Sequence, residues 1–226
     1  DTISVLSGLW KKLQKERLWK MRFFSIEGTV YQFISRFWDL VKLNVLWVVF
    51  SLPLVTCGAA TVAAYSVTLK MVKDEDQGIL MPFLRAFKAN FKQATMLWAV
   101  HLLVAYLVYL NLEIYNKVPN SPVFLPIAAL IIGFFGLMHL TYAFVLCASY
   151  HNTLLGTLKN AAAMATTYFV TTLMLWTVVG LLIFLFLYNA FLLYVGVLIG
   201  PSAVFLTVSG FASHLFGRIE KNNPSS

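Results

Sequence analysis

The chain has 226 residues, of which 60% are hydrophobic and only 12% are charged, and its formal net charge is +8. An ordinary globular domain is about 45–50% apolar and about 25% charged, so this composition excludes a typical water-soluble domain and indicates an integral membrane protein. We expect no nucleic acid partner. The lysines and arginines lie beside apolar runs, where membrane orientation and anionic lipids of the cytoplasmic leaflet account for them.

The chain opens with a basic segment, residues 1–24, that has an amphipathic pattern. Leu6 and Trp10 share one helical face and lysines lie off it, which predicts a short helix on the membrane surface. A disordered basic tail is the alternative. We expect residues 25–216 to form one transmembrane helical domain and residues 217–226 to form a polar C-terminal tail.

The first apolar block, residues 34–72, is too long for one membrane span, which needs about 20 residues. Pro53 lies near its middle and is followed by Thr56 and Gly58, residues that favour a turn. The block therefore predicts a helical hairpin with spans near 34–53 and 57–73. The second span opens with glycine and alanine, which let helices pack closely in lipid.

The longest polar interruption between the apolar runs lies near residues 73–93. If it forms a helix from about Leu80, it carries phenylalanine and leucine on one face and cations on another. We predict an amphipathic helix at the cytoplasmic surface of the membrane, where the protein meets its partner. The candidate partner-binding residues are Phe83, Arg85, Phe87, Lys88, Phe91 and Lys92.

The rest of the chain predicts four more spans and a second surface segment near residues 151–167. Tyr188, Asn189 and Ala190 offer a break in the last apolar block, and Pro201 should kink the final helix. The second surface segment resembles the first in its pattern of leucines and lysine, so a weak internal duplication and chance similarity both remain open. The expected spans are near 94–115, 123–150, 168–187 and 191–211.

Six spans place both termini and both surface segments on one side of the membrane. Of the 17 lysines and arginines, only Lys117 then lies on the other side. The positive-inside rule assigns the cation-rich side to the cytoplasm. We therefore predict an all-α, polytopic transmembrane helical bundle of about six spans, with both termini cytoplasmic.

The sequence offers no motif for catalysis, and we predict no enzyme activity, no catalytic residues, no cofactor and no metal site. It contains no P-loop, no HExxH and no GxSxG sequence. Cys57 and Cys147 fall near opposite membrane faces in this topology, so we expect no disulfide between them.

The ionisable residues His101, His139 and Glu113 lie within predicted spans, where such residues are costly and often functional. His101 and His139 occupy neighbouring spans. They form either a haem-binding or proton-relay pair or, as we favour, two neutral imidazoles that are hydrogen-bonded within the bundle. Glu113 lies near the outer end of its span. We expect it to reach the headgroups or pair with Lys117, and cation binding is the alternative.

The segment from Ser51 to Trp98 resembles the conserved block of the YesL-like family of bacterial membrane proteins, and the resemblance covers about Met21 to Phe216. The block begins with Pro53 and the Thr56-x-Gly58 sequence, which precede an alanine-rich helix. A second surface segment is marked by Leu158-Lys159-Asn160. The other matching residues are Lys73-Asp74-x-Asp76, Phe83 and Phe87-Lys88-x-Asn90-Phe91-Lys92-Gln93-Ala94.

Members of this family of unknown function are typically found with carbohydrate ABC importers of Gram-positive bacteria. The resemblance therefore implies a non-catalytic accessory subunit of a sugar or glycan importer in the bacterial plasma membrane. Such a subunit would pack against the permease and contact the ATPase from the cytoplasmic side. Two alternatives remain: a small stand-alone transporter or channel, or a haem-binding redox subunit that depends on His101 and His139.

Overall fold

A computed structural model describes the chain over residues 31–32, 34–75, 78–118, 121–150 and 152–222. Within these residues every regular element is a helix, which confirms the predicted all-α class. The chain divides into two compact units, residues 1–40 and 41–226. In the first unit, residues 34–40 are helical. The surface helix predicted for residues 1–24 lies outside the described residues.

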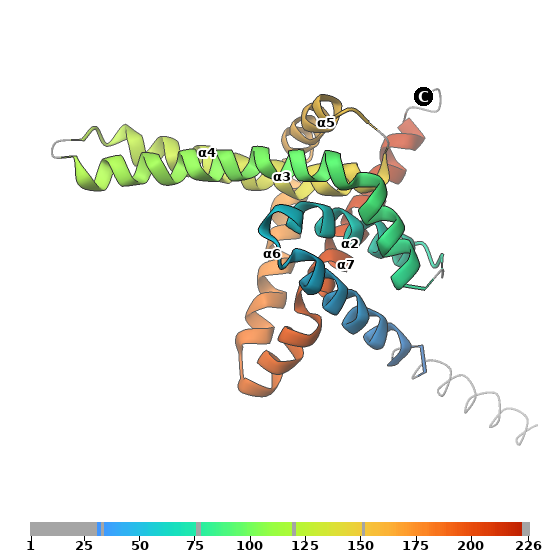
Figure 1. Cartoon of the computed structure of the whole chain (residues 1–226). Coiled ribbons are helices and arrows are strands. Elements are labelled where there is room, and N and C mark those ends of the chain that lie inside the picture. The colour runs from blue at the N-terminus through green and yellow to red at the C-terminus, as the bar shows by residue number, and fades with distance from the viewer. Residues whose placement is uncertain (1–30, 33, 76–77, 119–120, 151, 223–226) are drawn as a thin grey trace, which may run out of the picture. The chain divides into compact units, whose positions relative to one another are not determined.

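The second unit opens with helical residues 41–51 and continues through one short 3-10 helix, η1, and the α-helices α2 to α7 (Figure 1). The elements are η1 (Leu54–Thr56), α2 (Cys57–Val72), α3 (Leu80–Lys117), α4 (Phe124–Ser149), α5 (Leu154–Thr167), α6 (Phe169–Leu187) and α7 (Ala190–Asn222). The last helix continues beyond the predicted span near 191–211, and it includes residues 217–222 of the predicted polar tail.

Within the described residues, five helices are long and apolar enough to cross a membrane, which agrees with a polytopic bundle. The expected span near 34–53 is not among them. Its helical residues include three charged side chains, Arg36, Asp39 and Lys42. A sixth crossing, and with it the cytoplasmic position of both termini, therefore remains a prediction.

The predicted hairpin turn occurs at Pro53 and is closed by Thr56. The backbone N–H of Thr56 donates to the carbonyl of Pro53 at 2.8 Å, and the Thr56 hydroxyl donates to the carbonyl of Phe50 at 2.6 Å. Helix α2 then begins at Cys57, where the sequence predicted the second span. A short polar side chain therefore satisfies a carbonyl that the interrupted helix leaves without its usual donor.

The boundary expected near Ala94 is wrong, because the amphipathic segment and the following span form one helix. Helix α3 runs for 38 residues from Leu80 to Lys117. Pro82 lies in its first turn, where proline is tolerated because the first N–H groups have no intrahelical partner. At 1.5 Å per residue the helix is about 57 Å long. This exceeds the hydrocarbon core of about 30 Å, so part of α3 must extend beyond it.

Helix α2 is the centre of the second unit and packs against α3, α4 and α7. Its small side chains allow this close packing, and Ala59, Ala60, Ala63 and Ala64 are fully buried. At Gly58, an added Cβ would lie 2.5 Å from the Trp98 Cβ atom and 2.7 Å from the Ala94 carbonyl oxygen. Only glycine therefore allows α2 and α3 to approach this closely, as the small-residue pattern predicts.

Helix α7 contains Pro201, whose ring nitrogen carries no hydrogen to bond the carbonyl four residues earlier. That carbonyl belongs to Val197. The side-chain amide of Asn44 donates to it at 2.9 Å and also to the Leu198 carbonyl at 2.9 Å. Asn44 is 5% exposed. A polar residue far away in the sequence thus takes the place of the missing backbone donor.

Candidate functional site

The start of α3 carries the predicted partner-binding residues, and the structure divides them into an inner and an outer set. Phe83 is 0% exposed and Phe87 is half-buried. Phe91 is 40% exposed, and the cationic residues Arg85, Lys88 and Lys92 are exposed. Only the outer set is accessible for contact with another molecule, so Phe83 cannot itself contact a partner in this arrangement.

The inner phenylalanines attach α3 to its own bundle. The ring of Phe50 packs edge-on against Phe83 and Phe87, with ring centres 5.5 Å and 4.9 Å apart. Phe87 contacts Phe91 in turn, with ring centres 5.5 Å apart. Such aromatic pairs stabilise a packed contact by about 0.5–1.5 kcal/mol each beyond area burial. They hold the start of α3 in place and leave its cationic face exposed.

The two predicted surface segments are linked by hydrogen bonds. The Gln93 amide donates to the Asn152 carbonyl at 2.9 Å and to the Thr157 hydroxyl at 3.0 Å. Helix α5 begins just after Asn152, and the side chain of its N-cap residue Thr153 accepts from the Gly156 N–H. The contact fixes α5 against α3.

His101 and His139 are hydrogen-bonded within the bundle, which agrees with the interpretation that the sequence favoured. His101 Nε2 lies 3.0 Å from His139 Nδ1. The two outer nitrogens, His101 Nδ1 and His139 Nε2, lie 2.7 Å and 2.9 Å from the carbonyl oxygens of Leu97 and Leu158. Every ring nitrogen therefore already faces a protein partner.

The three contacts of this histidine pair need more hydrogens than two neutral imidazole rings carry. Carbonyl oxygens only accept, so both outer nitrogens must carry hydrogen, and the central contact needs a third. Two neutral imidazoles supply one N–H each. With both rings neutral, two of the three contacts carry a hydrogen.

Glu113 forms an ion pair with Lys117 near the end of α3, with an O–N distance of 2.5 Å. The predicted pairing is confirmed. Cys57 and Cys147 are both free thiols, as expected. Within the described residues, no group of three or more histidine, cysteine, aspartate or glutamate side chains could hold a metal ion.

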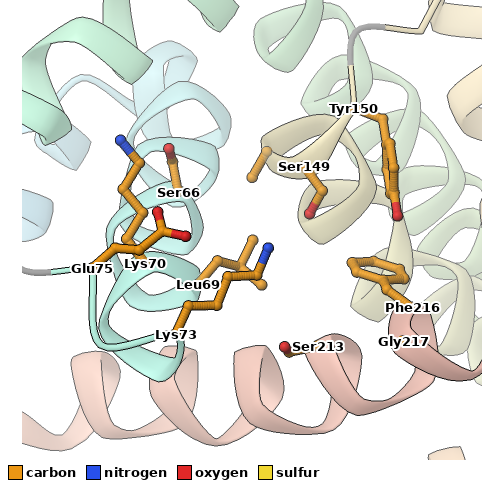
Figure 2. A pocket seen from close by; sticks show the side chains of 11 residues that line it. Ser66, Leu69, Lys70, Lys73, Glu75, Ser149, Tyr150, Ser213, Phe216 and Gly217 are labelled. Carbon is orange, nitrogen blue, oxygen red and sulfur yellow. The ribbon is translucent and has the colours of Figure 1, made fainter. Parts of the chain in front are cut away.

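A polar cavity of about 390 Å³ lies where α2, α4 and α7 approach one another (Figure 2). The last turn of α2 and the turn that follows it contribute Lys70, Lys73 and Glu75. Ser149 and Tyr150 come from the end of α4. Alternating spans require α2, α4 and α7 to run in the same direction across the membrane, and a cavity lined by the C-terminal parts of all three agrees with that topology.

Sequence reasoning did not find this cavity. Lys73 and Glu75 fell within the predicted amphipathic segment and Lys70 within the block that carries the family resemblance, but neither signal indicated a cavity. Ser149 and Tyr150 lie far along the chain from Lys73 and Glu75, so no local spacing in the sequence joins these residues. The one available signal was that Ser149 and Tyr150 follow directly on a long apolar run, as Lys70 and Lys73 do.

A second cavity, of about 410 Å³, is mainly apolar and is lined by residues of α2, α3, α4, α6 and α7. Trp47, Trp98 and Trp176 line it. Their indole N–H groups donate to the Thr61 hydroxyl, the Leu54 carbonyl and the Thr141 hydroxyl, respectively. The tryptophans are therefore satisfied within the protein, and their rings offer this cavity only apolar surface.

These features define the class of protein: an integral membrane protein built from helices, with a polar cavity at the ends of its spans. The model of the DUF624 family, described as a protein of unknown function, matches residues 40–112. This match covers residues 40–112 of the 226-residue chain, and DUF624 is the family that the YesL-like resemblance indicates. No curated protein and no solved structure matches the chain.

Proposed function

We propose that the protein is a non-catalytic accessory subunit of a carbohydrate ABC importer in the bacterial plasma membrane, with both termini in the cytoplasm. The family resemblance suggests this assignment. One observation carries it: α3 is longer than a bilayer is thick, and its first turns expose Arg85, Lys88, Phe91 and Lys92. In the proposed orientation this face is available to the ATPase subunits.

Contact with the permease would involve the apolar surface of the α3–α4 pair. These helices pack side by side (Figure 1). Large side chains such as Leu103, Leu107 and Leu130 are more than half exposed along the pair. In a membrane such a surface faces lipid or the helices of another protein. Close packing and interhelical hydrogen bonds, rather than hydrophobicity, then select the partner.

The accessory role has a thermodynamic condition. An ABC importer alternates between conformations, and a bound subunit shifts that equilibrium only if its affinity differs between them. Docking at both the permease and the ATPase would supply such a difference, because the two contacts change relative position during transport.

The proposal is tested by purifying the tagged full chain from native membranes in mild detergent and identifying the bound proteins by mass spectrometry. We expect permease and ATPase subunits. Reversing the exposed charges with R85E, K88E and K92E should release the ATPase and leave the fold intact. The matched control is K159E, an exposed cation on α5. Absence of every transporter subunit at all detergent strengths would refute the proposal.

A stand-alone transporter is the second candidate. Pro201 inside α7 favours it, because helices that break near a proline often form substrate sites in transporters. In this chain the carbonyls of Val197 and Leu198 are already bonded to Asn44. They are therefore not available to a substrate in this conformation. Substrate flux into proteoliposomes that contain only this chain would support this candidate over the accessory role.

The haem-binding candidate requires His101 and His139 to present nitrogens to one iron. In this arrangement each ring nitrogen lies within 3.0 Å of a protein atom, and two of the nitrogens contact each other. Haem binding would need this chain of contacts to break. A Soret band in the absorption spectrum of the purified protein would revive that candidate.

A further inference from the structure

The polar cavity lies at the level where three spans end. Lys70 and Lys73 are the first charged residues after the apolar run of α2, and Ser149 is the last residue of α4. The residues of α7 that line the cavity, Ser213, Phe216 and Gly217, come just before Arg218, the first charged residue of that helix. In membrane proteins the first charged residues beyond a span lie among the lipid headgroups. The cavity therefore lies at headgroup depth.

Two cations and one anion line this cavity from the same wall. Figure 2 shows the ammonium group of Lys73 directed toward the middle of the cavity, whereas the Lys70 ammonium points away from Ser149 and Tyr150. The Glu75 carboxylate lies on the same side of the cavity as the two lysines. The intervening Asp74 has a φ of 55°. This left-handed turn, together with the bond from the Glu75 N–H to the Lys70 carbonyl, sets the backbone position of Glu75 just after α2.

Ser149, Tyr150 and Phe216 form the opposite wall of the cavity, which offers one hydrogen-bond acceptor and an apolar surface. Ser149 donates its hydroxyl hydrogen to the Val145 carbonyl at 2.8 Å, which leaves its oxygen to accept a hydrogen bond. Tyr150 packs edge-on against Phe216, with ring centres 5.3 Å apart. The cavity thus offers a cationic donor at Lys73, acceptors at Glu75 and Ser149, and an aromatic wall.

We propose that this cavity binds a phosphate ester that also carries an ammonium group, the chemistry of an ethanolamine phosphate headgroup. The phosphate lies against Lys73, and the ammonium donates to Glu75 and Ser149. An anionic headgroup without an amine offers no cation to the Glu75 carboxylate, so nothing in that headgroup offsets the repulsion between the phosphate and this carboxylate. Phosphatidylethanolamine in the membrane and free phosphoethanolamine in solution both carry these groups.

The test uses the full chain in nanodiscs of phosphatidylcholine that contain equal amounts of phosphatidylethanolamine and phosphatidylglycerol. Native mass spectrometry then counts the lipids that stay bound as detergent strips the protein. We expect phosphatidylethanolamine to be retained over phosphatidylglycerol. K73Q should lower that retention about tenfold, because a charge-assisted hydrogen bond is lost. E75Q should abolish the preference between the two lipids.

Two further variants separate binding from folding. K73R keeps the charge and donors and should keep the bound lipid, and K159Q removes an exposed cation on α5, outside the cavity, and should leave lipid retention unchanged. The proposal is overturned if wild type retains both lipids equally, or if K73Q and K159Q behave alike.

The source of the ligand is settled by adding soluble phosphoethanolamine to the nanodiscs. Displacement of bound phosphatidylethanolamine shows that the cavity takes the free compound as well. Retention of the lipid at high concentrations of the free compound assigns the site to the membrane lipid. Binding of neither one refutes the proposal.

Discussion

The helical segment Leu54–Val72, which is η1 followed by α2, and helix α6 are both apolar and long enough to span a membrane, but they lie in opposite surroundings. In the most apolar stretch that contains α2, 61% of the residues are buried inside the protein, whereas the corresponding value for α6 is 11%. The more hydrophobic of the two, α6, is the more exposed one. Inside a bilayer, hydropathy therefore reports contact with lipid, and small residues such as Ala60 and Ala64 mark the protein interior.

The largest expected loss of stability comes from adding one methyl group to α2. Gly58→Ala on α2 places a Cβ within 2.7 Å of the Ala94 carbonyl oxygen, so α2 and α3 must separate. We expect a loss of about 3 kcal/mol, near the upper end of the usual cost of overpacking. The measurement is the free energy of unfolding in detergent.

Gly180→Ala on α6 is the matched control, because no atom lies within 4 Å of its added Cβ. Alanine has the higher helix propensity, so this variant should be unchanged or more stable by up to about 1 kcal/mol. Equal losses at both positions would contradict the contrast between the two helices.

A smaller effect is expected at the proline of α7, where an amide side chain replaces a backbone donor. Asn44→Ala should leave the Val197 and Leu198 carbonyls without their partner and cost about 2 kcal/mol. In a Pro201→Ala background the restored N–H can bond Val197, so the same substitution should cost less. A double-mutant cycle measures this coupling, and strictly additive losses would show that the amide does not compensate for the proline.

The smallest expected loss of stability comes from removing one buried hydroxyl group. The oxygens of Thr68 on α2 and Ser209 on α7 are 2.6 Å apart and fully buried. Thr68→Val should cost about 1 kcal/mol, because the Ser209 hydroxyl loses its partner. Thr177→Val on α6 removes an exposed hydroxyl that bonds only its own helix, to the Leu173 carbonyl. Thermal unfolding should distinguish the first variant from wild type, but not the second.

Much of the helical order was predictable, because the lengths of the apolar runs and the turn residues are local signals. The turn at Pro53, the start of α2 at Cys57 and the break before Ala190 all follow from them. The continuity of α3 was not predictable in the same way. A change from an amphipathic to a uniformly apolar pattern alters what surrounds a helix, but it does not end the helix.

The candidate sites were less predictable, because they depend on tertiary contacts. The periodicity placed Phe83, Phe87 and Phe91 on one face, but it did not indicate that Phe50 would cover the first two. His101 and His139 were expected in neighbouring spans, whereas their direct contact depends on how α3 and α4 pack. The polar cavity joins residues from three helices, so its charges and hydroxyls share no sequence motif.

The central claim is that α3 crosses the membrane with its cationic start in the cytoplasm. Single cysteines at Lys88 and Lys117, in a chain with Cys57 and Cys147 replaced by alanine, test it in intact cells. A thiol reagent that cannot cross the membrane should label position 117 and spare position 88 until the cells are opened. Labelling of position 88 in intact cells would contradict both the orientation and the proposed contact with an ATPase.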